Sequence, residues 1–292
     1  MYKIVRKEQL SGNNLLYEIY APDVARKCLP GQFLITKLDK KAERIPLTIC
    51  DYDREKGTIV IVFQPVGAST TRYLDMEEGD EFQDVVGPLG NPSELLELDK
   101  EELDKLNILF IAGGVGSAPV YPQVKWMKEN GKNVDVILGA RNKDLVILED
   151  EMREAANNLY VCTDDGSYGF KGLVTEKLKE LHAQGNKYDV AVIIGPMIMM
   201  KFGVLACKEV GIPQVIVSLN PIMVDGTGMC GACRVSVHNE VKFACVDGPE
   251  FDGYGVDFDN AMKRQAQYKT FEGRKMLELI EGDTHHGGCG NC

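Results

Sequence analysis

The chain has 292 residues, more than one ordinary compact core needs and enough for two or three structural modules. Hydrophobic residues make up 44% and charged residues 26%, a composition typical of a soluble globular protein. The 33 basic and 44 acidic side chains give a net charge of −11. A nucleic-acid interface needs a basic footprint, so this balance argues against nucleic-acid binding, and it also disfavours anionic membrane surfaces.

The sequence shows no targeting or membrane segment. None of its apolar runs approaches the roughly 20 residues that a membrane-spanning helix needs. The opening residues, MYKIVRKEQL, turn polar quickly and lack the apolar centre of a signal peptide. We therefore expect a cytoplasmic protein, in which most of the nine cysteines are reduced thiols or metal ligands.

Residues 1–92 are predicted to form an antiparallel β-barrel. Short β-rich runs alternate there with turn signals such as SGNN, PG and DREKG. The four clearest runs cover residues 15–21, 31–38, 44–52 and 57–66. A short helical stretch, STTRYLDM, follows the fourth run. Residues 93–106 are acidic and helix-prone, and we interpret them as a solvent-exposed connector.

Residues 107–220 show a different rhythm. Short, almost wholly apolar runs (NILFIA, VDVILGA, LYVCT, DVAVIIG and QVIVSL) alternate with helical patterns. Such runs are typical of strands buried on both faces, and the alternation predicts right-handed crossovers around a parallel sheet. We therefore expect an α/β nucleotide-binding domain.

A cysteine-rich segment follows, within residues 221–265. Its spacing is Asp225-x4-Cys230-x2-Cys233-x11-Cys245, with glycines interleaved at 226, 228 and 231. A plant-type [2Fe–2S] site uses C-x4-C-x2-C and a later cysteine, and here aspartate stands first. Zinc bound by three cysteines and a carboxylate is an alternative, as are inert buried thiols. We favour the [2Fe–2S] cluster, with Asp225 the least secure of its ligands.

Glycine-rich turns at strand ends predict the nicotinamide site. The turn after the first parallel strand lets a pyrophosphate approach the N-terminus of the next helix, although it lacks the G-x-G-x-x-G fingerprint. Its predicted binding residues are Gly113, Gly114, Val115, Gly116 and Pro119. At the ends of the following strands we add Gly139, Arg141, Asp164, Gly195 and Met197. Arg141 is either a contact to the adenosine ribose or its 2′-phosphate, or an ordinary surface arginine. Asp164 or Asp165 near a ribose would favour NAD over NADP.

Three ordered motifs carry a family resemblance over residues 2–265. They are RIPLTI at 44–49, then GPLGNP with IAGGVGSAP, and finally the loop with one aspartate and three cysteines. Together they resemble the ferredoxin-reductase-like electron-transfer subunits. That family includes the iron–sulfur subunit of dihydroorotate dehydrogenase and the small subunit of NADH-dependent reduced ferredoxin:NADP oxidoreductase. Aspartate in the first ligand position indicates the second of these branches.

The resemblance implies FAD in the barrel. Pro46, Leu47 and Thr48 would lie along the isoalloxazine, with Thr48 near its N5 edge. The other residues implied in FAD binding are Arg44, Val62, Gln64, Gly67, Ser69 and Thr70. Arg44 departs from the family pattern, because relatives usually place the arginine where this chain has Ile45. This shift of one position sets Arg44 apart from the arginine that clamps the phosphates in those relatives.

The resemblance also implies the function. Electrons would pass between NAD(H), FAD and the [2Fe–2S] cluster, in complex with a larger subunit that has its own FAD and [4Fe–4S] clusters. That complex would couple NADPH, NAD and ferredoxin by electron bifurcation. Hydride transfer needs alignment and no general base, so no catalytic side chain is expected. Two alternatives are a stand-alone NAD(P)H:ferredoxin-type reductase and a zinc-stabilised nucleotide-binding protein without redox chemistry.

Residues 266–292 form the expected C-terminal tail. It ends in THHGGCGNC, in which Cys289 and Cys292 are two residues apart. These groups could bind a metal or contact the partner's clusters. A disordered terminus is the interpretation that we favour.

Overall fold

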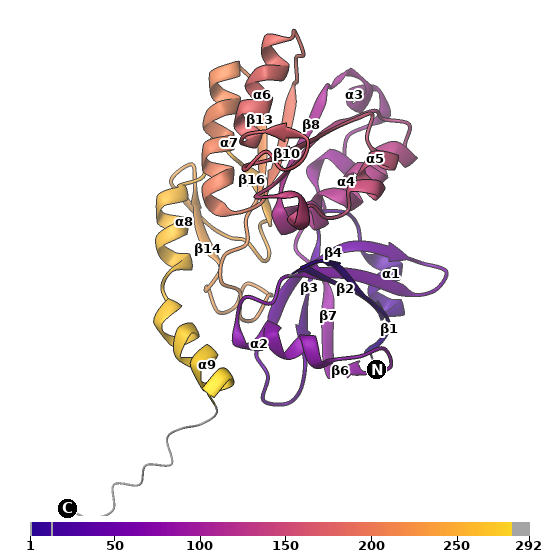
Figure 1. Cartoon of the computed structure of the whole chain (residues 1–292), viewed down its shortest axis with the longest axis vertical. Helices are drawn as coiled ribbons and strands as arrows, with labels where there is room; N and C mark the ends of the chain where they lie inside the picture. Colours follow the sequence, from indigo (N-terminus) through magenta and orange to yellow (C-terminus); the bar gives the residue numbers. More distant parts are fainter. Residues whose placement is uncertain (1, 13, 282–292) are drawn as a thin grey trace, which may run out of the picture.

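The computed structural model describes residues 2–12 and 14–281, and the tail cysteines Cys289 and Cys292 lie outside that range. In the described part of the chain no helix has the length and apolar character needed to cross a bilayer. The structure contains two seven-stranded sheets stacked one above the other in Figure 1, with a third, smaller part beside them.

The N-terminal sheet is antiparallel throughout and runs in the order β6-β1-β2-β5-β4-β3-β7. Its edge strands β6 and β7 are separated by one residue, so the chain itself nearly closes the sheet into a barrel. The predicted antiparallel barrel is confirmed. Its strands are β1 (Tyr2–Ser11), β2 (Asn14–Tyr20), β3 (Phe33–Lys37), β4 (Ile45–Asp53), β5 (Thr58–Phe63), β6 (Glu81–Phe82) and β7 (Asp84–Leu89).

Aromatic rings fill the barrel core. Tyr17 packs edge-on against Phe63 with ring centroids 5.1 Å apart, and Tyr73 packs in the same way against Phe82. The phenol of Tyr17 also donates a hydrogen bond to the carbonyl of Tyr73. Buried aromatic pairs of this geometry stabilise a core beyond the area that they bury. Three short helical segments border the barrel: α1 (Pro22–Lys27), α2 (Ala68–Thr71) and η1 (Arg72–Asp75).

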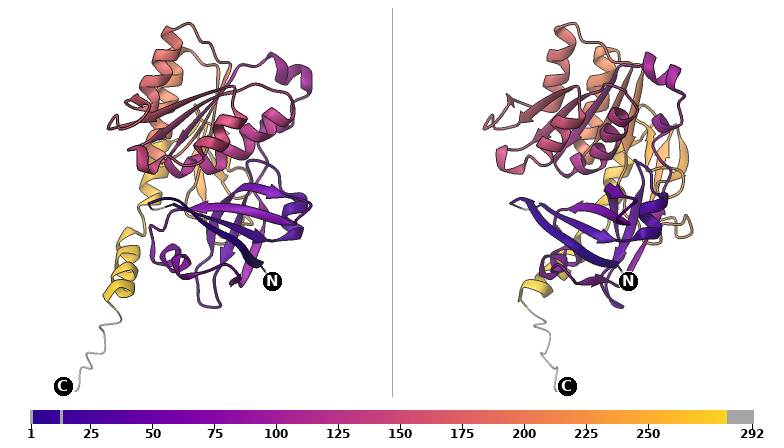
Figure 2. Two further views of the ribbon diagram at one scale, coloured as in Figure 1. Left: turned by 45° about the vertical axis from the view of Figure 1, so that its right-hand side comes forward. Right: turned by 90° about the vertical axis from the view of Figure 1, so that its right-hand side faces the viewer.

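The second sheet runs in the order β11-β10-β9-β8-β12-β13-β16 and is parallel except for β16, which confirms the predicted α/β domain. Every residue of β8 is buried, because helices cover both faces of this sheet (Figure 2). The strands are β8 (Ile108–Gly113), β9 (Asp135–Ala140), β10 (Asn158–Thr163), β11 (Phe170–Lys171), β12 (Val190–Ile194), β13 (Gln214–Ser218) and β16 (Glu250–Asp252).

Alternate residues of β8 pack into two separate hydrophobic cores, one on each face of the sheet. Leu109 and Ile111 pack with α6 (Val174–Ala183) and α7 (Met197–Val210). Ile108 and Phe110 pack on the opposite face with α4 (Ser117–Glu129). The remaining helical segments of this half are η2 (Glu94–Leu96), α3 (Lys100–Lys105), η3 (Gly114–Gly116), η4 (Lys143–Leu145) and α5 (Glu149–Ala155).

The C-terminal part consists of a hairpin and two helices. The hairpin is β14 (Arg234–Val237) with β15 (Glu240–Phe243), and β16 then joins the edge of the parallel sheet. Helix α8 (Phe258–Gln265) packs on β14 and α7, whereas α9 (Lys269–Glu281) runs down beside α2 of the barrel (Figure 1).

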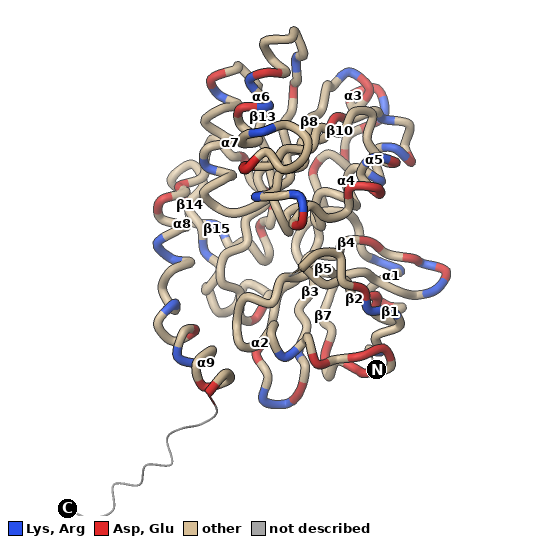
Figure 3. Tube along the Cα trace, viewed as in Figure 1, with Lys and Arg blue, Asp and Glu red and all other residues tan. Residues whose placement is uncertain are grey.

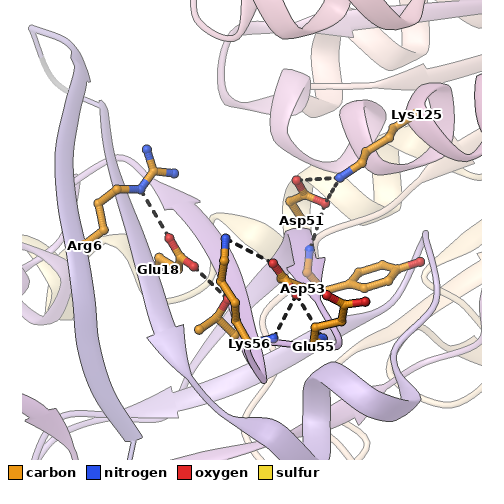
Figure 4. A network of polar contacts seen from close by, with 9 residues as sticks. Arg6, Glu18, Asp51, Asp53, Glu55, Lys56 and Lys125 are labelled. Carbon is orange, nitrogen blue, oxygen red and sulfur yellow. Dashed lines mark hydrogen bonds and ion pairs between the residues drawn. The ribbon is translucent and has the colours of Figure 1, made fainter.

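Helix α4 joins the two large domains. The ammonium of Lys125, on α4, donates to both carboxylate oxygens of Asp51, on β4, at 2.7 and 2.9 Å (Figure 4). A small apolar cluster beside this ion pair contains residues from both domains: Leu16, Cys50, Val62, Ala118, Ile147 and Leu148. Strand β4 therefore touches the nucleotide-binding domain at one end and carries the RIPLTI motif at the other. Elsewhere, basic and acidic residues are interspersed along the helices and loops (Figure 3).

Candidate cofactor sites

A β-hairpin closes the eleven-residue spacer of the cysteine segment. Arg234, directly after Cys233, pairs with Phe243, two residues before Cys245. The turn is His238-Asn239, both at positive φ (52° and 63°), which is the backbone geometry that tight hairpin turns prefer. The hairpin brings the Cys233 and Cys245 sulfur atoms to 3.2 Å from each other.

The carboxylate of Asp225 caps its own loop. One oxygen accepts hydrogen bonds from the backbone N–H groups of Thr227 (3.0 Å) and Met229 (3.1 Å), and the other accepts from the Thr227 hydroxyl (2.8 Å). These hydrogen bonds lower the pKa of Asp225, so the group is anionic at neutral pH. Gly226 and Gly228 both have positive φ (80° and 84°), which lets the chain turn this tightly.

The donor set fits a two-iron cluster. The loop offers a buried thiol pair, Cys233 with Cys245, and on the adjoining turn the exposed Cys230 and the carboxylate of Asp225. A [2Fe–2S] cluster distributes its four protein ligands over two irons. Burial and the neighbouring Cys233 thiol raise the pKa of Cys245, so binding iron here would release protons.

The cysteine segment packs directly on the barrel. A Cβ on Gly226 would lie 2.5 Å from Cδ1 of Ile35, on β3, and 3.0 Å from Cδ1 of Leu89, on β7. Only glycine permits so close an approach at positive φ. One apolar cluster unites the two parts, and its buried members are Phe33, Ile35, Met223, Cys233, Ala244 and Cys245.

Two arginines hold the backbone of this segment. Arg44, just before β4, donates to the carbonyl oxygens of Val224 (3.1 Å) and Asp225 (3.2 Å). Arg264, on α8, donates to the carbonyl oxygens of Ala232 and Arg234, on either side of Cys233. Arg44, which the resemblance implies in FAD binding, therefore contacts the cysteine segment in this structure.

The predicted flavin residues occupy the mouth of the barrel. The first four residues of β4, Ile45–Thr48, are only half-buried, whereas burial becomes nearly complete at Ile49. Thr48 is paired with Phe33 of β3, and Pro46 with Ile35. Among the described residues, neither the Thr48 hydroxyl nor the Gln64 amide has a hydrogen-bond partner, which leaves both able to bind a ligand.

The turn that leads into α2 also faces open space. A Cβ on Gly67 would meet no atom within 4 Å, so a ligand can approach this backbone closely. The hydroxyl of Thr70 bonds back to Gly67, and that of Ser69 donates to Glu43. Val62, on β5, is buried in the interface between the domains.

The three glycines of the nucleotide turn differ in their surroundings. A Cβ on Gly113 would lie 2.1 Å from Sδ of Met199, and one on Gly116 would lie 2.3 Å from the carbonyl oxygen of Ile194. Gly114 has positive φ (56°) and no atom within 4 Å of a Cβ, so it faces open space. Packing against backbone requires glycine at 116, whereas at 113 the close neighbour is the end of the flexible Met199 side chain. Gly114 leaves room for a ligand.

The other predicted nucleotide residues lie at the same edge of the parallel sheet, because β8, β9, β10 and β12 all end there. Arg141 and Asp164 are exposed, Val115 and Pro119 are half-buried, and Gly139 packs against Val174. The Met197 side chain is buried in the core between α7 and the sheet. The side chain that lies against Gly195 is that of Met199. The parallel register therefore gathers the whole set except the Met197 side chain.

Similarity to known proteins agrees with this architecture. Residues 220–257 match the iron–sulfur cluster binding domain of dihydroorotate dehydrogenase B, and residues 110–204 match the oxidoreductase NAD-binding domain. A Thermotoga maritima homologue of the dihydroorotate dehydrogenase B (NAD(+)) electron-transfer subunit is 48% identical over 270 residues, which cover 92% of each chain. The chain belongs to the family of dihydroorotate dehydrogenase B electron-transfer subunits.

The chain is also similar to two further proteins. It is 64% identical over 292 residues to a protein encoded in the adh 3′ region of Clostridium beijerinckii, covering 99% of this chain and 98% of the other. A solved structure of NADH-dependent reduced ferredoxin-NADP oxidoreductase, described in terms of flavin-based electron bifurcation, contains a chain that is 45% identical to this one. The two superpose with a TM-score of 0.88 over 96% of this chain and 98% of that chain. The protein is thus an oxidoreductase-family electron-transfer subunit.

Some contacts in this electron-transfer subunit have no sequence signal. Arg44 and Arg264 bind backbone carbonyls, an acceptor that every residue type provides. Met199 was missed because the helical pattern of residues 197–211 does not reveal which of its methionines faces the sheet edge. The glycines at 113 and 195 are visible in the sequence, but they do not show that the Met199 side chain lies against both.

Proposed function

We propose that this chain passes electrons between NAD(H), a bound FAD and a [2Fe–2S] cluster, as the small subunit of an electron-bifurcating ferredoxin:NADP oxidoreductase. One observation carries the proposal. The cysteine segment is packed on β3 and β7 and is hydrogen-bonded to Arg44, two residues before the segment of β4 predicted to bind the flavin. A cluster on this segment and a flavin on β4 would therefore lie on adjoining parts of one barrel, and we expect them to exchange electrons.

The barrel residues would hold the FAD. Pro46, Leu47 and Thr48 form a half-buried strand edge against which a flat ring system can lie, and the free amide of Gln64 can hydrogen-bond to it. Gly67, Ser69 and Thr70 would hold the phosphate-bearing portion, where the backbone at Gly67 faces open space. When bound, the flavin supplies the conversion between two-electron and one-electron transfer.

The strand ends of the parallel sheet would hold the nucleotide. Gly114 leaves room for the pyrophosphate at the start of α4, where free N–H groups favour an anion. Arg141 and Asp164 are exposed near the expected position of the adenosine ribose. The ion pair between Lys125 and Asp51 fixes this edge relative to the barrel, and hydride transfer depends on such alignment. No side chain of the chain needs to gain or lose a proton at the reacting carbon.

The cluster loop offers an exit for electrons to a partner. Cys230 is exposed, and so are three apolar side chains of the same segment: Met229 is 87% exposed, Val224 52% and Val246 40%. An exposed apolar rim around a redox site is typical of a protein-docking surface. The partner that we propose is a larger subunit with its own FAD and [4Fe–4S] clusters, through which ferredoxin would react.

An anaerobic reduction experiment tests the proposal. The protein is titrated with NADH and, separately, with NADPH while flavin absorbance and the electron paramagnetic resonance (EPR) signal of a reduced [2Fe–2S] cluster are recorded. We expect NADH to bleach the flavin and to produce the cluster signal in the same sample. A flavin that is reduced while the cluster stays oxidised under every nucleotide condition would contradict the proposed relay.

Dependence on the partner is tested separately. The chain alone should turn over poorly with ferredoxin, and adding the larger subunit should restore coupling between NADH, NADP and ferredoxin. Full ferredoxin reduction by the isolated chain would instead establish a stand-alone reductase.

A further inference from the structure

Arg44 is the polar link between β4 and the aspartate end of the cluster loop. Its guanidinium reaches 180 residues along the chain to two successive carbonyl groups, those of Val224 and Asp225. The planar fork of arginine suits such a pair of acceptors, because its N–H groups are fixed relative to one another.

The Asp225 backbone is therefore fixed from three sides. Its carboxylate is held by Thr227 and Met229, and its carbonyl is held by Arg44. The following residue, Gly226, lies against Ile35 of the barrel. The contacts of Arg44 and Gly226 hold the loop against the barrel, whereas those of the carboxylate lie within the loop itself.

We propose that Arg44 is a positioning residue for electron transfer. It holds the Asp225 end of the cluster loop in a fixed position on the flavin-binding strand, and its positive charge raises the reduction potential of the cluster. The inference rests on the proposed function, because it requires a cluster bound by Asp225 and the three cysteines. It assigns Arg44 to the cluster loop and not to the phosphates of the FAD.

The effect of Arg44 on the reduction potential follows from the sign of the charges. Reduction adds an electron to a cluster held by four anionic ligands, in a chain whose net charge is −11. A permanent cation beside one ligand stabilises the reduced state, and net charge is one of the factors that set cluster potentials. The positioning role depends on the planar set of N–H donors in the guanidinium group, which lysine lacks although it keeps the positive charge.

Three variants separate these parts: Arg44→Gln, Arg44→Lys and, as the matched control, Arg54→Gln. Arg54 also donates to a backbone carbonyl, that of Cys28, and lies over the ring of Tyr52, in the turn at the other end of β4. Each protein is purified without oxygen and assayed for iron and flavin. Its cluster potential is measured by EPR-monitored titration, and the rate of cluster reduction after flavin reduction by rapid freeze-quench.

Arg44→Gln should lower the cluster potential by roughly 59 mV, a tenfold change in the one-electron equilibrium. In Arg44→Lys the cluster potential should stay close to that of the wild type. Its EPR lines should be broader, and its cluster should be reduced several-fold more slowly. Arg54→Gln should change neither quantity. An unchanged potential and rate in cluster-loaded Arg44→Gln and Arg44→Lys would overturn the inference while leaving the proposed function intact. A wild-type protein without a cluster would overturn the proposed function itself. If Arg44→Gln fails to fold, an Arg44→Lys protein identical to wild type in line shape and rate would overturn the inference.

Discussion

The side-chain amide of Gln123, on α4, donates a 2.6 Å hydrogen bond to the carboxyl group of Glu250, on β16. This contact ties the helix that follows the nucleotide turn to the strand that follows the cluster loop. Burial raises the pKa of Glu250 from 4.5 to about 7, an effect that the hydrogen bond from Gln123 only partly offsets.

The raised pKa of Glu250 predicts that the folded state loses stability as pH rises. The folded protein holds this proton up to about pH 7, whereas the unfolded chain releases it near pH 4.5. The stabilisation is therefore fully present below pH 4.5 and is lost as pH rises through about 7, with an upper limit of about 3 kcal/mol. Glu250→Gln should match the wild type near pH 4.5 and be more stable than it at pH 8.

Urea unfolding of both proteins between pH 4.5 and 8 measures this difference. Glu240→Gln, at an exposed position on β15, is the matched control and should parallel the wild type throughout. A Glu250→Gln protein that shows the same pH profile as the wild type would refute the assignment.

The glycines of the nucleotide turn should respond differently to alanine. Gly116→Ala places a Cβ 2.3 Å from a backbone carbonyl, so it should destabilise the fold by several kcal/mol with or without nucleotide. Gly114→Ala meets no atom and should cost only about 1 kcal/mol for its positive φ, but it should weaken NADH binding at least tenfold. Thermal melting and a fluorescence titration with NADH distinguish the two, and normal NADH affinity in Gly114→Ala would exclude this turn as the binding site.

Three substitutions at Asp225 separate its loop-capping role from iron ligation. Asp225→Asn keeps acceptors for Thr227 and Met229 but removes the anionic ligand, so the fold should persist with less iron. Asp225→Cys supplies a thiolate, a stronger electron donor, and should retain the cluster at a lower potential. Asp225→Ala should lose both roles. Equal iron content and equal potential in all three variants would remove Asp225 from the ligand set.

The ion pair between Lys125 and Asp51 should affect alignment more than stability. Both side chains are partly exposed, so Lys125→Met should cost at most about 1 kcal/mol. Because the pair joins the two domains, the same variant should slow flavin reduction by NADH severalfold. Stopped-flow absorbance measures that rate, and Lys128→Met, one turn further along α4, is the control.

The two large domains were predictable because their patterns are local. Short, fully apolar runs such as residues 108–113 are typical of strands covered on both faces, and the alternation of such runs with helical patterns indicates a parallel sheet. The RIPLTI motif lies at the start of β4, as predicted. Strand β1 was not predicted, since its many charged residues read as a polar terminus. In the barrel Lys3, Arg6 and Glu8 occupy exposed positions of this strand, and Lys7 is half-buried.

The predicted site residues came from motifs, whereas their arrangement depends on long-range contacts. The sequence placed Cys233 and Cys245 in one site but did not reveal the hairpin between them, because β14 and β15 have only four residues each. The contact from Arg44 to the Asp225 loop spans the whole α/β domain and ends on backbone atoms. No local pattern encodes such a contact.

The central claim is that Asp225, Cys230, Cys233 and Cys245 bind a [2Fe–2S] cluster beside a flavin. Metal and flavin analysis of an anaerobically purified protein, with its EPR spectrum after reduction, tests this most directly. We predict about two irons and one FAD per chain, with the EPR signal of a reduced [2Fe–2S] cluster. A colourless protein that contains zinc and no flavin would contradict the account.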